Sequence, residues 1–275
     1  MKPILKWAGG KNKLKKLILE KILSFNNYWE PFAGSASVAL EVFEIKKCDI
    51  FLSDINDDLI EFYKFVRTSY KDFISSVLDI KSKFNASFDK KEQYLELRDK
   101  FNSATGAERS TLFYFLNKTS FNGLTRYNSS GKFNVPFGQR EFSVDVEGIK
   151  QFSDFLNSSR VHLSQYKYEL ISPQKFDFVY LDPPYHPMTE TSNFTSYHSE
   201  NWTNQDEISL KLFCDNLNKN QVQFVLSNND VKFIRDLFSE YTVCNLEVRK
   251  SVGAKKETRK KSSELLIFNN NHLTN

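Results

Sequence analysis

The chain has 275 residues and a mass of 32.2 kDa, which suits one large domain or a core domain with an insertion. Its composition, 40% hydrophobic and 26% charged, is that of a globular protein and excludes an intrinsically disordered chain. No apolar run approaches signal-peptide length or the roughly 18 residues that cross a bilayer, so we expect a cytoplasmic protein without a membrane partner.

Two consecutive strand–turn–helix units open the chain. Residues 28–43 begin with an apolar strand, break at the turn 31–34, and continue as a helix with its apolar residues on one face. Residues 49–66 repeat the form: the strand ends at Asp54, Asn56 is the expected N-cap, and apolar residues follow at helical spacing. Two such units predict a parallel sheet flanked by helices.

The middle of the chain has a different pattern. Residues 69–119 have the pattern of helices with no strand signal between them, which indicates an insertion between sheet elements. Residues 121–140 are rich in Asn, Gly and Ser with alternating aromatic residues, as in a loop or hairpin that displays side chains outward. We predict an inserted helical region at 69–159 within a core domain formed by 1–68 and 160–275.

Sheet elements return after the insertion. The segments "KFDFVYLDPPY", "VQFVLSNND" and "YTVCNLEVRK" are expected strands, with a helix at about 204–220 between the first two. The last strand, 263–268, is expected to pair with its predecessor as an antiparallel hairpin. The predicted fold class is therefore α/β, with a mostly parallel sheet and a C-terminal antiparallel hairpin.

Charge and cysteine usage indicate the partners. Formal net charge is only +4, but residues 1–21 and 249–261 each carry seven basic residues and one Glu. Such basic segments favour a polyanionic partner, although the second could also be a solvated hairpin tip. The three cysteines lie far apart without Cys-x-x-Cys spacing, so we expect neither disulfides nor a metal site.

Two strand ends carry candidate chemistry for a nucleoside-containing cofactor. Gly34 would let a ligand approach the backbone closely, and Asp54 closes the next strand, where a carboxylate can accept ribose hydroxyls. The segment "PFAGSAS" lacks the glycines of a pyrophosphate-binding G-x-G-x-x-G turn. A plain packing turn is the alternative.

The segment "YLDPPYHP" (180–187) ends a buried strand with groups that suit an aminated ring. Asp182 can accept a hydrogen bond from an amino group, and the rigid prolines, beginning with Pro183, would hold a backbone carbonyl toward the same group. Tyr185 offers a flat face on which a base can stack. Such a site needs neither a covalent intermediate nor a metal. A strand exit stiffened by proline is the structural alternative.

A set of segments carries a family resemblance. They are "LKWAGGK" (5–11), "EPFAGSASV" (30–38), "SDINDDLI" (53–60), "LNKTSFNGLTRYNSSGKFNVPFG" (116–138), "YLDPPYHP" (180–187), "SNFTSYHSENWT" (192–203), "LSNND" (226–230) and "TRKKSSELL" (258–266). In content and order they resemble the Dam-type adenine-specific DNA methyltransferases, which belong to the alpha group of amino-methyltransferases. The resemblance covers nearly the whole chain.

The resemblance implies a Rossmann-like methyltransferase sheet, an inserted helical DNA-recognition region and S-adenosylmethionine as cofactor. It also implies methylation of a flipped-out adenine in double-stranded DNA, within GATC. The matching catalytic positions are Asp182, Pro183 and Tyr185, and the matching cofactor positions are Trp7, Lys11, Asp54 and Asp182. The matching DNA-binding positions are Lys6, Phe121, Asn122, Leu124 and Arg126, and the chain is expected to be a monomer in solution.

Departures and rival functions remain open. Phe121 stands where the nearest relatives are expected to have tyrosine, which keeps the ring and drops a hydroxyl, and the basic segment before the last strand is longer than usual. One rival is a methyltransferase acting on RNA or on cytosine amines. Another is a DNA-binding protein that has lost turnover. The aspartate of "DPPY" and the "NGLTRYN" context argue against the first, and the intact "DPPY" beside an intact "KWAGGK" argues against the second.

Overall fold

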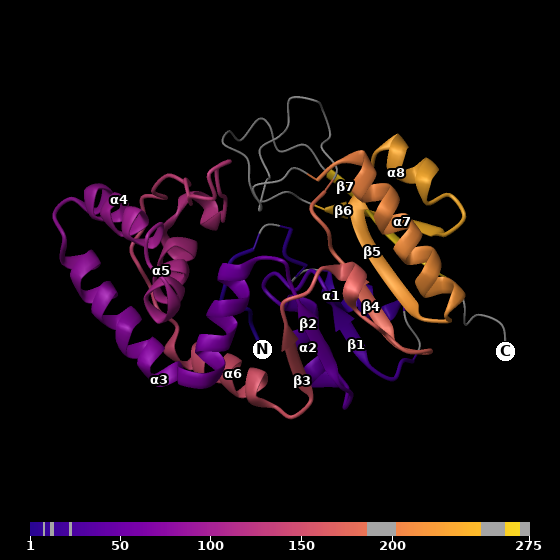
Figure 1. Cartoon of the computed structure of the whole chain (residues 1–275), viewed down its shortest axis with the longest axis horizontal. Helices are drawn as coiled ribbons and strands as arrows, with labels where there is room; N and C mark the ends of the chain where they lie inside the picture. Colours follow the sequence, from indigo (N-terminus) through magenta and orange to yellow (C-terminus); the bar gives the residue numbers. More distant parts are fainter. Residues whose placement is uncertain (8, 12–13, 22–23, 186–201, 249–261, 270–275) are drawn as a thin grey trace.

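The computed structural model describes residues 1–7, 9–11, 14–21, 24–185, 202–248 and 262–269, and within them it shows a seven-stranded sheet (Figure 1). The predicted basic segment at 249–261 and most of the motif at 192–203 lie outside the described residues. The strand order is β3-β2-β1-β4-β5-β7-β6. The strands are β1 (Tyr28–Glu30), β2 (Ile50–Ser53), β3 (Val161–Ser164), β4 (Phe178–Leu181), β5 (Gln223–Asn229), β6 (Thr242–Val248) and β7 (Ser262–Phe268).

The sheet is mostly parallel. Strands β3, β2, β1, β4 and β5 pair in parallel, whereas β7 pairs antiparallel with both β5 and β6. The predicted α/β class with its C-terminal antiparallel pair is thus confirmed. Strand β3 was missed because its apolar run is short.

The helices are α1 (Lys15–Glu20), α2 (Ser37–Ile45), α3 (Asp57–Ala86), α4 (Lys90–Phe101), α5 (Gly106–Thr119), η1 (Phe121–Gly123), α6 (Val146–Asn157), η2 (Tyr168–Leu170), α7 (Asn204–Lys219) and α8 (Lys232–Leu237).

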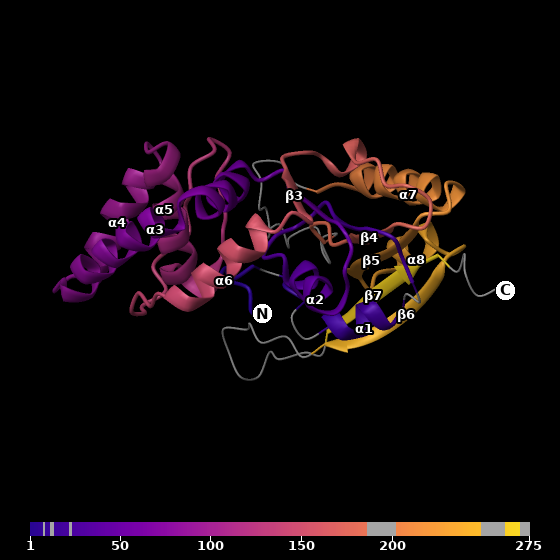
Figure 2. The same ribbon diagram turned by 90° about the horizontal axis from the view of Figure 1, so that it is seen from below.

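Both faces of the sheet are covered, as a central parallel sheet requires. Figure 2 shows α1 and α2 on one face and α7 on the other. Strand β4 explains the arrangement, because successive side chains of a strand point to opposite faces. Phe178 and Tyr180 join the core shared with α2 and α3, while Val179 and Leu181 join the core shared with α7 and α8.

The helical insertion stands beside the β3 edge of the sheet (Figure 1). Helix α3 leaves the sheet, changes direction at the non-helical residue Ser69, and packs along α5. Its buried residues recur at helical spacing: Leu59, Ile60, Phe62, Tyr63, Val66, Phe73, Val77 and Phe84. The kink falls at the start of the insertion that the sequence predicts.

Candidate functional site

The candidate site lies where three neighbouring parallel strands end. Strand β1 has β2 on one side and β4 on the other, so the order in which strands are added to the sheet reverses between β1 and β4. Ligands of open α/β sheets bind outside the carboxyl ends of the strands at such a switch point. The turn at Gly34, Asp54 and Asp182 follow β1, β2 and β4 respectively.

The turn at Gly34 is shaped for close packing. Asp54 accepts hydrogen bonds from the Gly34 amide at 3.0 Å and from the Asn56 amide at 2.9 Å, and the Tyr63 hydroxyl donates to the Gly34 carbonyl at 2.5 Å. Gly34 has a φ of +46°, and a Cβ there would lie 2.6 Å from Trp7 Cδ1. Glycine is favoured here, because the backbone conformation is unfavourable for residues with a side chain and a Cβ would clash with the Trp7 ring. Trp7 and Asp54 therefore meet at one turn.

Asp182 is paired with a lysine from the N-terminal segment. Lys11 Nζ donates to the two oxygens of Asp182 at 2.8 and 3.0 Å and to the Gly9 carbonyl at 2.6 Å. The lysine side chain is 2% exposed. Burial raises the pKa of Asp182, and the Lys11 ammonium acts against that rise. The predicted residues Lys11 and Asp182 thus form one ion pair, with Pro183 buried directly after it.

Tyr185 completes the cluster together with a residue that was not predicted. The Tyr185 ring lies 4.9 Å from Lys11 Nζ, within range of a cation–π interaction. Its hydroxyl donates to Glu264 Oε2 at 3.2 Å, and the same oxygen is 4.0 Å from Lys11 Nζ. Glu264 comes from β7, on the far side of β5 from Asp182. Its one sequence signal is an acidic residue directly before the apolar run that ends the strand.

A second carboxyl group is buried close to the turn. Glu30, the last residue of β1, accepts hydrogen bonds from the Tyr28 hydroxyl at 2.8 Å and from the Ala39 amide at 2.9 Å. Burial raises the pKa of Glu30 to about 8. The group joins β1 to α2 and has a structural role.

The predicted DNA-binding residues gather at the end of α5. The Lys6 backbone and the Asn117 side chain exchange hydrogen bonds of 2.9 and 2.7 Å, and a Cβ on Gly123 would lie 2.6 Å from Lys6 Cδ. Lys6 therefore lies over the segment that carries the aromatic residue Phe121, which is 46% exposed. The exposed Asn122 adopts a φ of +55°, and Leu124, further along, is half-buried.

Positive charge surrounds this segment. Partial burial and the charge of Arg140 lower the pKa of Lys6. Burial and then the charge of Lys6 lower the pKa of Lys118, in the last turn of α5, to about 8. Lys118 and Arg140 were not predicted as functional residues. Their proximity to Lys6 follows from the fold, because Asn117 ties the N-terminal segment to α5.

Arg126 differs from expectation in one respect. The Gly- and Asn-rich segment predicted a guanidinium free to reach outward, but Arg126 is half-buried and its Nε donates to Asn134 Oδ1 at 2.9 Å. The Asn134 amide in turn donates to the Arg126 carbonyl at 3.2 Å. Arg126 is thus oriented by the opposite strand of its own hairpin.

The two groups of predicted residues are joined by adjacent residues of the N-terminal segment. Lys6 contacts the Gly123 segment, and Trp7, the next residue, contacts the Gly34 turn.

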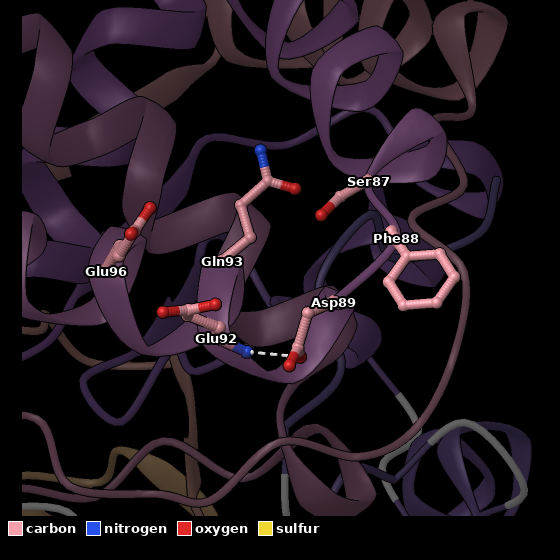
Figure 3. A pocket seen from close by; sticks show the side chains of 6 residues that line it. All are labelled: Ser87, Phe88, Asp89, Glu92, Gln93 and Glu96. Atoms are coloured by element: carbon pink, nitrogen blue, oxygen red, sulfur yellow. Dashed lines mark hydrogen bonds between the residues drawn. The ribbon is translucent and has the colours of Figure 1, made fainter.

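A separate pocket lies at the turn between α3 and α4 (Figure 3). It contains none of the predicted site residues and is lined by Ser87, Phe88, Asp89, Glu92, Gln93 and Glu96.

Asp89 in that pocket caps α4 by accepting from the Glu92 amide at 2.9 Å. Within the described part of the chain, no group of three or more His, Cys, Asp or Glu residues could hold a metal ion. None of the described helices is both long and apolar enough to cross a membrane.

The sheet, the strand-end acids and the glycine turn define a Rossmann-like α/β protein with a candidate ligand site at the carboxyl ends of its strands. The family model described as D12 class N6 adenine-specific DNA methyltransferase matches residues 7–252, and the chain belongs to this family. It is therefore an adenine-specific DNA methyltransferase, a site-specific enzyme that methylates adenine in DNA.

Relatives extend over nearly the whole chain. Type II methyltransferase M.MjaIII of Methanocaldococcus jannaschii is 34% identical over 98% of this chain and 99% of its own length. DNA adenine methylase of Escherichia coli K12 is 31% identical over 96% and 94%. A methyltransferase from Pyrococcus furiosus of known structure covers 96% of this chain and 85% of its own at 11% identity, with a TM-score of 0.41.

Proposed function

We propose that this enzyme transfers the methyl group of S-adenosylmethionine to the 6-amino group of an adenine flipped out of double-stranded DNA, within GATC. The observation that carries the proposal is the Lys11–Asp182–Tyr185 cluster beside the Gly34–Asp54 turn. The cluster supplies groups for a planar aminated ring, and the turn supplies groups for a nucleoside.

The residues at the turn fit S-adenosylmethionine, which supplies an electrophilic methyl group when bound. Backbone amides orient the Asp54 carboxylate, and a carboxylate accepts up to about four hydrogen bonds, so its oxygens suit ribose hydroxyls. Trp7 contacts the Gly34 turn, and Lys11 pairs with Asp182 at the end of the neighbouring strand β4. We assign Trp7, Lys11, Gly34, Asp54 and Asp182 to cofactor binding.

Asp182 and Pro183 accept hydrogen bonds from the 6-amino group of the target adenine. The amino group of adenine is a poor nucleophile because its lone pair is delocalised into the ring. Acceptors aimed at its two hydrogens, the Asp182 carboxylate and the backbone carbonyl after it, favour the pyramidal geometry from which it can attack. Lys11 stabilises the ionised carboxylate against burial, so that Asp182 stays an acceptor.

Tyr185 receives the ring of the flipped base. Its contacts with Lys11 and Glu264 hold the phenol from two sides, which orients the ring for stacking. Because a base inside the duplex is out of reach, the target must leave the stack before its amine can meet Asp182.

The DNA is held and recognised by the segment at the end of α5. Lys6, Phe121, Asn122 and Leu124 lie on or beside this segment, and the neighbouring positive charges suit DNA phosphates. Arg126 recognises a guanine, because an arginine side chain can donate two hydrogen bonds to the O6 and N7 atoms of guanine in the major groove. The bond from Nε to Asn134 would orient the guanidinium for that contact.

The test uses labelled S-adenosylmethionine with two duplexes. One contains GATC, and in the other both A·T pairs of that site are replaced by G·C pairs. We expect label in the first duplex and resistance to a methyl-sensitive nuclease. Asp182→Ala should abolish transfer, and because it leaves the buried Lys11 ammonium without its partner, thermal unfolding of the variant is measured beside its activity so that the loss is assigned only to folded protein. Equal labelling of both duplexes, or an active Asp182→Ala enzyme, would contradict the proposal.

A further inference from the structure

A buried cluster at the first turn of α3 brings three distant segments together. The Asp58 carboxylate accepts hydrogen bonds from Arg109 Nε, from Arg109 Nη2 at 3.0 Å and from the Tyr127 hydroxyl at 2.5 Å. Asp58 belongs to α3, Arg109 to α5, and Tyr127 directly follows Arg126. The Asp58 side chain is only 10% exposed, and hydrogen bonds that involve an ionised partner are among the stronger ones.

On one side, short bonds connect this cluster to the cofactor turn. The Asn56 side chain caps α3 by accepting from the Leu59 backbone amide at 3.0 Å, and the Asn56 backbone amide donates to Asp54 at 2.9 Å. Asp54 in turn accepts from the Gly34 amide at 3.0 Å. The first turn of α3, with Asp58 on it, is therefore fixed relative to the turn at Gly34.

On the other side, the cluster holds one strand of a small hairpin. Tyr127 pairs with Phe133 in an antiparallel bridge, and Arg126 is hydrogen-bonded to Asn134 through its backbone and its side chain. The opposite side is attached through Asn102, after α4, which exchanges bonds of 2.8 and 3.2 Å with the Phe133 backbone. Arg109 Nη1 donates to the carbonyl of the preceding residue, Phe101, at 2.8 Å. The cluster therefore reaches both sides of the hairpin, directly through Tyr127 on the side that carries Arg126 and through Arg109 and the end of α4 on the other.

Both donors keep their protons at ordinary pH. Burial and the Asp58 carboxylate raise the pKa of Tyr127 well above its usual value. Burial lowers the pKa of Arg109, but the hydrogen bond and charge of Asp58 outweigh it. The cluster is therefore a constant structural link and not a pH switch.

We propose that Asp58 is a positioning residue which, through Tyr127 and Arg109, fixes the Arg126 hairpin relative to the cofactor turn and thereby determines how strictly the enzyme selects its DNA sequence. The inference rests on the proposed role of Arg126 in recognition. Asp58 acts through these two residues, because both of its carboxylate oxygens are bonded to Arg109 and Tyr127. Its loss should leave cofactor binding intact and relax the alignment between the recognised base and the reacting amine, which tolerates only small displacements.

The test compares Tyr127→Phe with a matched control. Tyr127→Phe removes the hydroxyl and keeps the ring, which packs against Phe133 with centroids 6.0 Å apart. Tyr241→Phe removes the same type of bond, from Tyr241 to Asp215 at 2.5 Å, in a cluster with Lys211 between α7 and the sheet. Each full-length variant is given labelled S-adenosylmethionine and a pool of duplexes with adenine in every flanking context.

The measured quantity is the ratio of methylation rates between the preferred site and sites that differ from it by one base. We expect Tyr127→Phe to narrow this ratio by roughly tenfold, the effect of a 1.4 kcal/mol change, with an unchanged KM for the cofactor. Tyr241→Phe should keep the wild-type ratio even if its melting temperature falls as much. In a double-mutant cycle, Asp58→Asn and Tyr127→Phe should be strongly non-additive.

Two results would overturn the inference: a wild-type ratio in Tyr127→Phe, or an equal narrowing in Tyr241→Phe, which would show a general effect of destabilisation. Failure of the proposed function gives a different result. If the wild-type enzyme prefers a sequence other than GATC, the GATC assignment fails while the comparison of variants still holds. If it methylates no adenine in any duplex, the proposed function fails and the inference fails with it.

Discussion

Replacing Lys11 with methionine should move the acid limb of the pH–rate profile to higher pH. Burial raises the pKa of Asp182, Lys11 opposes that rise, and the charge of Glu264 adds to it. In the proposed mechanism, methyl transfer needs the ionised Asp182 carboxylate as acceptor, so we expect activity to fall as the pH drops through the pKa of Asp182. Without the ammonium, the pKa is higher and the fall begins at a higher pH.

The same substitution should destabilise the protein. At 2.8 Å and an effective dielectric constant of about 20, the two charges attract by about 6 kcal/mol. Desolvation cancels part of this, and removing one partner of a buried pair typically costs about 3–5 kcal/mol of unfolding free energy. We expect a loss in this range at neutral pH. It should shrink at low pH, where Asp182 can take up a proton.

The assay is the rate at saturating cofactor and DNA as a function of pH, over the range in which both enzymes remain folded. Lys15→Met is the control, because Lys15 also pairs with a carboxylate, Glu41 at 2.7 Å, outside the site; its side chain is 15% exposed, against 2% for Lys11. The control should keep the wild-type profile. An acid limb in Lys11→Met that coincides with that of the wild type would refute the role given to Lys11.

Three further predictions concern other residues. Gly34→Ala should lower the unfolding free energy by about 1–3 kcal/mol, because the backbone has a φ of +46° and the new Cβ would meet Trp7 at 2.6 Å. Gly131→Ala, at a φ of +70° with nothing within 4 Å, should cost clearly less in thermal unfolding; equal losses would exclude the clash. Glu30 retains its proton up to a pKa of about 8 in the native state, so stability should fall as the pH rises from about 4.5 to about 8 and then level off. Glu30→Gln should lack this slope in melting temperature, and a retained slope would assign it to another group. Arg126→Ala should reduce discrimination at the contacted guanine by about 1–3 kcal/mol, whereas an equal drop at all sites would mean that Arg126 only positions the DNA.

Local sequence patterns determined much of the fold. The strand–turn–helix units, the N-cap at Asn56 and the C-terminal antiparallel pair all follow from signals within about 20 residues, and the structure confirms them. Strand β3 and helix α8 were not predicted. Each is short, with four and six residues, and hydrophobic periodicity is weak over such lengths.

Gly34, Asp54, Asp182 and Tyr185 could be named from the sequence because they stand at predicted strand ends and turns. Trp7, Lys11 and Lys6 were named only from the family resemblance. The structure brings Trp7 to Gly34, Lys11 to Asp182 and Lys6 to the segment after α5. The state of Arg126 was not predictable in the same way. Its partner Asn134 is eight residues away, and the pair depends on the register of a hairpin that the sequence indicated only as a loop or hairpin.

Only the tertiary structure identified Glu264 and the Asp58 cluster. Tyr185 and Glu264 are 79 residues apart, Asp58 and Tyr127 are 69, and nothing in the intervening sequence specifies that they meet. Periodicity and capping are properties of neighbouring residues, so they can be inferred from short segments. Hydrogen bonds between distant carboxylates and phenols depend on where the strand order and helix packing place each chain segment, and that placement is decided by the burial of the whole core.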